Sequence, residues 1–263
     1  MELSKEERKR IKAENKARKL NQQLSMSVPM VDSKYTVLCV KFGNKYSRDY
    51  VERLRNMVSR NITVPYEFVC LTDDKHPIEG VRSIVIPHAG YQRGWWHKVH
   101  MFDPSLPLRG RVLYMDLDVI VCRNIDKLFT HYEKDFLGIR DFNRKFHTTF
   151  NSLNSSVMCW NAGQKAYIFE QFINNINGAQ RMHGDQDWIW HVAKHEIKFW
   201  PDEWIQSYKW EIRDKTEVTY NQGVREFKTI KNPHIPEECN IVVFHGDPKP
   251  ENIKDPFVID NWR

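Results

Sequence analysis

The chain has 263 residues, and its 40 Lys and Arg residues exceed its 34 Asp and Glu residues, so the formal net charge is +6. Aromatic residues make up 13% of the sequence and hydrophobic residues 41%, which excludes a disordered chain and is enough for the core of one large domain. Residues 1–25 carry a net charge of +4, which leaves only +2 for the rest of the chain. The body is nearly balanced, so the sequence does not indicate a specific nucleic-acid partner.

Three further absences narrow the class of protein. No apolar run reaches the roughly 18 residues of a transmembrane helix, and the N-terminal segment lacks the apolar core of a secretory signal. The cysteines are scattered singly and form no CxxC pair, which argues against a zinc finger and against a disulfide framework. We therefore expect a cytoplasmic protein.

The first predicted element is a charged helix over residues 4–24. Ser4 and Glu7 have the spacing of a capping box, and only a thin apolar stripe follows them. The pattern is typical of a solvated helical tail, which we assign to residues 1–30, with weak peripheral contact to a membrane or partner through residues 1–25 as the alternative. The remaining residues, 31–263, are predicted to form one folded domain.

After the tail, strands and helices alternate in the first half of that domain. The predicted order is strand 35–42, helix 47–61, strands 68–71 and 81–86, helix 95–102, strand 111–122 and helix 124–129. The second half is less regular, with strands 135–139 and 156–160, helices 164–176 and 185–195, and strand 240–245. This alternation predicts an α/β fold in which a mostly parallel central sheet has helices on both faces.

Several polar residues fall at or near strand ends, where open α/β sheets bind their ligands. They are Tyr46, Asp116, Asp118 and His245, and we expect them to converge. Asp116-Leu117-Asp118 follows the apolar run VLYM, and two neighbouring carboxylates in such a setting repel each other unless a cation or hydrogen-bond donors offset the repulsion. The alternative is an aspartate pair that ends the strand and caps the helix at Asn124.

The segment His245-Gly246-Asp247-Pro248-Lys249-Pro250 follows the last predicted strand. Neutral histidine can ligate a metal, glycine allows close backbone approach, and lysine can neutralise a phosphate. A lone histidine is more often a hydrogen-bonded structural residue. Together with Asp116 and Asp118, however, His245 completes an oxygen, oxygen and nitrogen ligand set that suits Mn²⁺ or Mg²⁺ holding a diphosphate.

Three other motifs allow two interpretations each. Gly184-Asp185-Gln186-Asp187 either caps a helix or carries chemistry, and Asn154-Ser155-Ser156 is either a turn or part of a site. The run from Trp95 to Lys98 is either core with a snorkelling charge or a wall beside a phosphate.

Taken in order, these motifs resemble those of the GT-A fold glycosyltransferases, especially the glycogenin-like retaining family 8 and its bacterial-type relatives. The resemblance covers about residues 35–262 and is carried by the blocks WWHKVHMF, VLYMDLDVIVC, NSSVM, GDQ and HGDPKP. It implies a single GT-A domain that moves a hexose, glucose or galactose, from a UDP-sugar to a hydroxyl of a carbohydrate or other acceptor, with retention of configuration.

The resemblance also implies a role for each matching residue. Asp116, Asp118 and His245 would hold Mn²⁺ or Mg²⁺. Asp185 and Gln186 would lie beside the donor sugar, with Gln186 nearest the anomeric carbon. Gln186 is a poor nucleophile, so we expect it to position the sugar, and we expect Asp185 to bind the sugar or stabilise charge. The nucleotide-sugar contacts would be Val40, Lys41, Phe42, Tyr46, Lys98, Asp116, Leu117, Asn154, Ser155, Gly246 and Lys249.

Two departures from the family pattern concern Ser156, where the family has Gly, and Leu117, where it often has Ala. A rival interpretation is a phosphatase of the haloacid dehalogenase type, which would use the DxD carboxylates as nucleophile and acid. In that class the motif normally lies on the first strand, whereas two strand–helix units precede Asp116 here, and the HGDPKP segment has no role.

Overall fold

A computed structural model describes residues 33–86, 90–91, 93–231 and 233–263, together with a few isolated positions between residues 9 and 19. Most of the predicted helix over residues 4–24 therefore lies outside the described residues, although the isolated positions within it are helical and exposed. The assignment of residues 1–30 to a separate tail stays a prediction.

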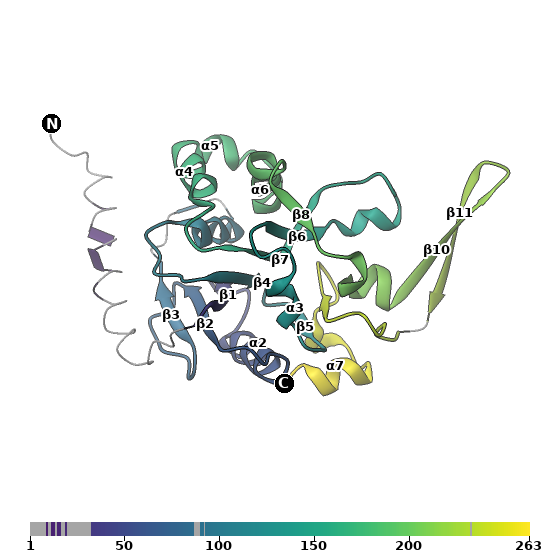
Figure 1. Ribbon diagram of the computed structural model, residues 1–263, viewed down its shortest axis with the longest axis horizontal. Helices are drawn as coiled ribbons and strands as arrows, with labels where there is room; N and C mark the ends of the chain where they lie inside the picture. The colour runs from purple at the N-terminus through teal and green to yellow at the C-terminus, as the bar shows by residue number, and fades with distance from the viewer. Residues whose placement is uncertain are drawn as a thin grey trace.

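The centre of the fold is a seven-stranded sheet in the order β3-β2-β1-β4-β7-β6-β8 (Figure 1). The strands are β1 (Tyr35–Lys41), β2 (Tyr66–Thr72), β3 (Arg82–Val85), β4 (Arg111–Met115), β6 (Phe136–Arg140), β7 (Leu153–Asn161) and β8 (Ile197–Phe199). Only β7 runs antiparallel to its neighbours, β4 and β6. The mostly parallel sheet of the predicted fold class is confirmed.

Helices cover both faces of this sheet, so its strands are buried on both sides. Successive side chains of a strand point alternately into two apolar clusters. Val37 and Cys39 of β1 belong to the cluster that packs under helix α2, whereas Leu38 belongs to the other. The second cluster is covered by the 3-10 helix Gly94–Phe102 and by three α-helices. These three are α4 (Ala166–Asn174), α5 (Ile176–Ala179) and α6 (Asp185–Ala193). The other α-helices with given bounds are α2 (Arg48–Arg60), α3 (Asp126–Thr130) and α7 (Pro256–Asn261).

The region 111–122, predicted as a strand interrupted by two carboxylates, divides at the DxD residues into two strands that belong to different sheets. β4 ends at Met115, and the chain turns at Leu117-Asp118 into β5 (Val119–Val121), which belongs to a second sheet with β12 (Ile241–Val243) and β9 (Ile205–Ser207). The amide of Asp116 donates to the carbonyl of Ser156 at 2.8 Å, and the amide of Phe244 donates to the carbonyl of Asp118 at 3.0 Å. The two aspartates thus lie where the chain passes from one sheet to the other.

Other differences from the predicted elements lie mainly in the second half. The segment predicted as a helix over 95–102 is a 3-10 helix, and β8, β9, α7 and the hairpin β10 (Asp214–Asn221) and β11 (Val224–Lys231) were not predicted. The hairpin projects away from the body of the molecule (Figure 1). Its tip has positive φ angles of 48° and 79° at Gln222 and Gly223, a pair of left-handed residues that suits a tight two-residue hairpin turn.

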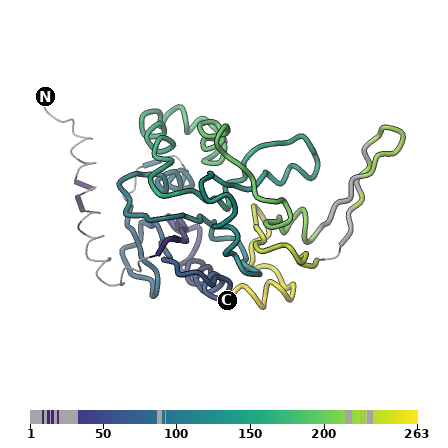
Figure 2. The backbone as a smooth tube through the Cα atoms, viewed as in Figure 1, coloured from purple at the N-terminus to yellow at the C-terminus, as the bar shows by residue number. Residues whose placement is uncertain are grey.

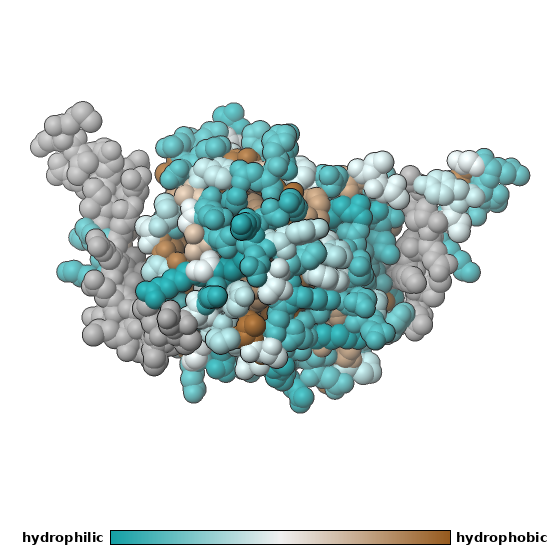
Figure 3. All heavy atoms as spheres, in the orientation of Figure 1, coloured by the Kyte–Doolittle hydropathy of each residue, from teal (hydrophilic) through white to brown (hydrophobic). Residues whose placement is uncertain are grey.

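The C-terminal segment returns to the start of the fold, beside α2 (Figure 2). Arg60 donates hydrogen bonds to the carbonyls of Asn261 at 2.7 Å and Arg263 at 2.9 Å. Within the described part of the chain, no helix has the length and apolarity needed to cross a membrane, and the face seen in Figure 3 is mostly hydrophilic.

Candidate active site

Asp116 lies at the end of β4 and receives two hydrogen bonds on one oxygen. Its Oδ1 accepts from the hydroxyl of Tyr114 at 2.5 Å and from Nζ of Lys98 at 3.1 Å. Tyr114 reaches Asp116 because residues i and i+2 of a strand point to the same face. Burial and the neighbouring Asp116 charge both raise the pKa of the Tyr114 phenol, so it is a donor at neutral pH.

Lys98 connects three elements beneath the DxD turn. Besides Asp116, its ammonium contacts Ser155 Oγ on β7 at 2.9 Å and Asp185 Oδ2 at the start of α6 at 3.3 Å. Ser155 Oγ also donates to Asp185 Oδ2 at 3.0 Å. Burial alone would lower the pKa of Lys98, but the two carboxylates outweigh it and the net shift is upward, so Lys98 stays charged.

Asp118 is the second aspartate of the turn, and two residues that are distant in sequence contact it. Its Oδ2 accepts from the hydroxyl of Tyr46 at 2.9 Å and from Nζ of Lys249. Lys249 also donates to the carbonyl of Phe244 at 3.3 Å. Burial and the Asp116 charge raise the pKa of Asp118, and the Lys249 ammonium and the Tyr46 hydroxyl oppose that rise. A cation near Asp118 therefore compensates for the unfavourable burial of its negative charge and for repulsion by Asp116.

His245 follows β12 and is held by aromatic packing. Its ring stacks on Phe142 with centroids 5.2 Å apart, and its Nε2 lies 2.6 Å from Ser207 Oγ. Burial, followed by the charge of Lys209, lowers the pKa of His245 to about 4, so the imidazole is neutral at neutral pH, the form that ligates metals.

The ligand types fit Mn²⁺ or Mg²⁺, since two carboxylates and a neutral imidazole are donors for these ions. Asp118 adds a buried carboxylate whose charge needs compensation. Among the described residues, no group of three or more His, Cys, Asp or Glu side chains is assembled closely enough to hold a metal ion. Completing the set would require His245 to be brought to the two aspartates, so the metal site stays a prediction.

The residues predicted beside the donor sugar form one hydrogen-bonded group. Gln186 Oε1 accepts from the amide of Ser155 at 3.1 Å, and Gln186 Nε2 donates to Asp141 Oδ2 at 3.3 Å. Asn154 Oδ1 accepts from the amide of Ser156 at 3.1 Å, so the NSS segment is a buried part of β7 and not a turn. Gly184 is the N-cap residue of α6, which begins at Asp185, and none of its side chains caps that end.

The residues predicted to line the base lie at the carboxyl end of β1, which pairs with β4. Phe42 stacks on His97 with centroids only 3.5 Å apart, and Lys41 Nζ donates to the carbonyl of Gly43 at 3.1 Å. Val40 is half-buried and packs against the cluster on the same side as Trp96. These residues are therefore close in the fold to Asp116 and Asp118, through the pairing of their strands.

Two predicted contact residues can act only through the main chain. Leu117 is 2% exposed and its side chain packs in the core, so only its backbone is available to a ligand. Gly246 has a φ of 73°, a left-handed conformation in which a side chain is disfavoured.

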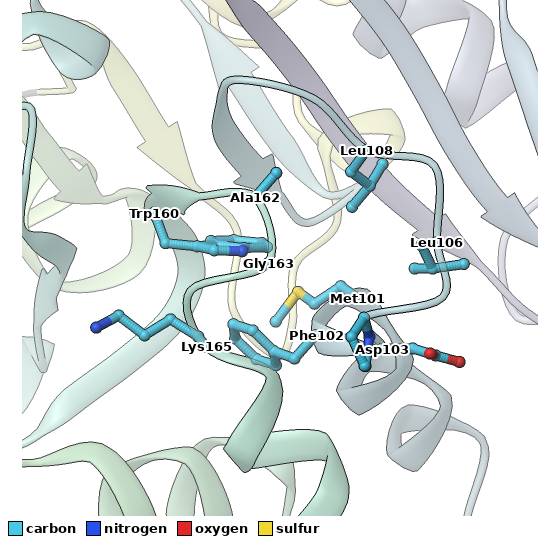
Figure 4. Close-up of a pocket in the computed structure, with 10 residues that line it drawn as sticks. Met101, Phe102, Asp103, Leu106, Leu108, Trp160, Ala162, Gly163 and Lys165 are labelled. Carbon is cyan, nitrogen blue, oxygen red and sulfur yellow. The ribbon is translucent and has the colours of Figure 1, made fainter.

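A small pocket of about 130 Å³ lies elsewhere, between Met101, Phe102, Trp160 and Lys165 (Figure 4). Its neighbour Ala162 donates to the carbonyl of Gly110, whereas Asp116 donates to Ser156 at the other end of the same strand pair. Gly110 and Asp116 are six residues apart, which is roughly 20 Å at the rise of a strand. The cavity is thus at the opposite edge of the sheet from the candidate active site.

Comparison with known proteins places the fold. No family model and no curated protein matches the sequence. Among solved structures, the glycosyltransferase GlyE of Streptococcus pneumoniae TIGR4 is similar with a TM-score of 0.51 and 18% identity, covering 65% of this chain and 46% of that one. The bifunctional glycosyltransferase WbbM is similar with a TM-score of 0.51 and 13% identity, covering 85% and 48%.

The fold is a GT-A-type glycosyltransferase fold. The chain spans less than half the length of these two neighbours, and the likeness at this identity concerns the fold alone. The predicted fold class is confirmed, and the architecture gives no support to the phosphatase alternative. Membership of family 8 in particular stays a prediction.

Sequence reasoning missed three residues of this site. Asp141 follows the apolar strand β6 just as Asp116 follows β4, so the same signal was present. Tyr114 sits two positions before Asp116, a spacing that predicts a shared face. Ser207 of β9 gave no signal, because its strand is only three residues long and forms by pairing with β12.

Proposed function

We propose that the protein is a metal-dependent glycosyltransferase that transfers a hexose from a UDP-sugar to an acceptor hydroxyl, with retention of configuration. Glucose and galactose are the proposed sugars. The observation that carries the proposal is the turn Asp116–Asp118, where two carboxylates at the end of β4 meet two lysines and two tyrosines in a GT-A-type fold.

In the reaction, the bond between the anomeric carbon and the diphosphate oxygen breaks, and a bond from that carbon to the acceptor oxygen forms. UDP leaves with the bonding pair, and the acceptor hydroxyl passes its proton to an oxygen of the departing diphosphate. Lys249 is assigned to stabilise the negative charge that grows on the diphosphate. Its ammonium contacts Asp118, and Lys249 itself lies on a loop. Tyr46 flanks the same carboxylate and is assigned to the base side.

Gln186 and Asp185 are assigned to the donor sugar. Both ends of the Gln186 amide are engaged, by Ser155 and Asp141, so the group is held in one orientation. A neutral, oriented amide suits positioning and not nucleophilic attack. Asp185 is charge-balanced by Lys98 at 3.3 Å and is assigned to sugar binding and to stabilising positive charge on the sugar ring.

The metal ligands we assign are Asp116, Asp118 and His245. A bound Mn²⁺ or Mg²⁺ supplies Lewis-acid stabilisation of negative charge on the leaving diphosphate. On this assignment the lysines that hold the two aspartates share them with the cation, and His245 contributes its neutral ring.

The proposal is tested by thermal unfolding with UDP and Mn²⁺, singly and together, and by UDP release from a panel of nucleotide sugars. A ligand at 100 times its Kd stabilises by about 2.7 kcal/mol. We expect UDP plus Mn²⁺ to raise the melting temperature more than either alone, and UDP-glucose or UDP-galactose to give UDP.

The Asp118→Asn variant is expected to lose both the joint stabilisation and UDP release. Asp187→Asn serves as the matched control, since Asp187 lies in the first turn of α6 and outside the assigned site. Wild-type protein whose melting temperature is moved by no nucleotide sugar would contradict the proposal, and full activity of Asp118→Asn in Mn²⁺ would contradict the metal assignment.

A further inference from the structure

An open groove lies beside the donor-sugar residues, between the loop that follows β6 and helix α6. Its volume is about 680 Å³, a size that accommodates a small organic ligand. The lining residues are His147, Thr149, Phe150, Asn151, Ser152 and Trp190.

Both walls of the groove connect to Gln186, one along helix α6 and the other through Asp141. Trp190 follows Gln186 by four positions on α6, so the two side chains lie on the same face of that helix. On the other wall, the carbonyl of Ser152 accepts from the amide of Asp141 at 2.8 Å, and the Asp141 carboxylate accepts from Gln186 Nε2 at 3.3 Å. The groove therefore begins next to the residue assigned to the anomeric carbon.

The loop that forms one wall is anchored where it leaves β6 and exposed where it returns to β7. Asp141 Oδ1 accepts from the amide of Asn143 at 2.9 Å, and the buried Arg144 guanidinium contacts the Glu211 carboxylate at 3.2 Å. On the returning part, Phe150 is 37% exposed. An anchored loop thus presents an aromatic ring to solvent in the groove that Trp190 also lines.

The chemistry of the lining distinguishes between ligand classes. Two aromatic rings offer flat apolar faces, and the histidine, threonine, asparagine and serine side chains offer hydrogen-bonding groups. A sugar ring has the matching form, with an apolar face of C–H groups and hydroxyls around its edge. No Lys, Arg, Asp or Glu is among the lining residues, so the groove lacks the charged partner that an anionic or cationic acceptor would need.

We propose that this groove is the acceptor subsite and that the acceptor is a neutral glycan, whose terminal sugar packs against Phe150 and Trp190. The proposal rests on the glycosyltransferase function proposed above. It places the acceptor hydroxyl beside Gln186.

The test is binding of the protein to an array of immobilised neutral oligosaccharides, with UDP and Mn²⁺ present. We expect the wild type to bind at least one glycan, and Phe150→Ala to weaken that binding roughly tenfold or more, as for an aromatic anchor of a binding surface. Phe150→Trp, which keeps an aromatic face, is expected to retain binding. Tyr132→Ala removes an aromatic ring that is 54% exposed outside the groove and should change nothing.

Stabilisation by UDP plus Mn²⁺ is measured on the same variants and is expected to be unchanged in all of them. Equal glycan binding by Phe150→Ala and the wild type would overturn the subsite. A wild type that responds to UDP yet binds no glycan would overturn the acceptor class while leaving the donor half intact. Glycan binding through Phe150 without any response to a nucleotide sugar would refute the transferase function, and the acceptor role with it.

Discussion

The two aspartates of the DxD turn are each held by a lysine, and the two lysines are built into the fold in different ways. Lys98 sits on the buried 3-10 helix, its side chain is 9% exposed, and it contacts oxygen atoms from β7, α6 and the end of β4. Lys249 lies on the loop after β12, its side chain is 16% exposed, and it contacts Asp118 and one carbonyl. The comparison indicates that Lys98 assembles the site, whereas Lys249 can exchange its partner for a ligand.

The largest expected effect comes from removing the assembling lysine. Lys98→Met leaves the partly buried Asp116 and Asp185 without the buried counter-charge that they share, and breaking a buried ion pair on one side costs up to about 3–5 kcal/mol. Urea denaturation measures the free energy of unfolding. Lys194→Met, at an exposed lysine after α6, is the control and should be nearly neutral. A loss below about 1 kcal/mol for Lys98→Met would remove the distinction between the two lysines, since exposed pairs contribute no more than this.

Lys249→Met tests the other side of the comparison. Because Lys249 is less constrained, we expect a smaller loss of stability than for Lys98→Met but a weaker interaction with UDP. A charge-assisted contact is worth about 1.5–3 kcal/mol, so the Kd for UDP should rise roughly tenfold to a hundredfold. Isothermal titration in Mn²⁺ measures it. Unchanged UDP affinity together with a large loss of stability would make Lys249 a structural residue like Lys98.

The two lysines also show how much of the site could be predicted from the sequence. Asp116, Asp118, Lys98 and Lys249 were identifiable because each follows or interrupts an apolar run, and strand ends of a parallel sheet share one edge. The first half of the fold was predictable for the same reason, since its strands are buried on both faces and α2 keeps a clear helical period. The alternation there comes from local sequence alone.

The second half could not be predicted in this way. β8 and β9 are three residues long and exist through pairing with distant strands, so no local pattern marks them as part of a sheet, whereas the equally short β12 lies in the apolar run predicted as strand 240–245. The interruption at the two aspartates was expected, but the change of sheet was not, because Val119–Val121 continues the apolar character of β4. The pairing of β5 with β12 and the contact between Asp118 and Phe244 show that the chain has changed sheets.

His245 lies on the same loop as Lys249, and its imidazole is a titratable group by which the folding of that loop can be tested. Its pKa is held to about 4, against an ordinary 6.5. Between these values the unfolded chain binds a proton that the folded chain does not, so stability falls as pH drops from about 6.5 to about 4, by about 3 kcal/mol for this residue.

His245→Asn cannot titrate and should make that loss shallower in unfolding experiments across the same pH range. Some pH dependence will persist, because burial also lowers the pKa of His100 to about 4. Identical slopes for the variant and the wild type would show that His245 is not buried neutral in the folded state.

Gly246 gives the smallest effect and the finest test of the Lys249 loop. A Cβ at this position meets no atom within 4 Å, so the only structural cost of Gly246→Ala is its left-handed backbone at φ 73°, about 1 kcal/mol. Because Gly246 is assigned a backbone contact with the diphosphate, the added methyl should lower UDP affinity more than it lowers stability. Gly163→Ala, with φ 78° and equally open space, is the matched control for strain. Equal loss of UDP affinity in both variants would assign the effect to the backbone alone and not to contact with the ligand.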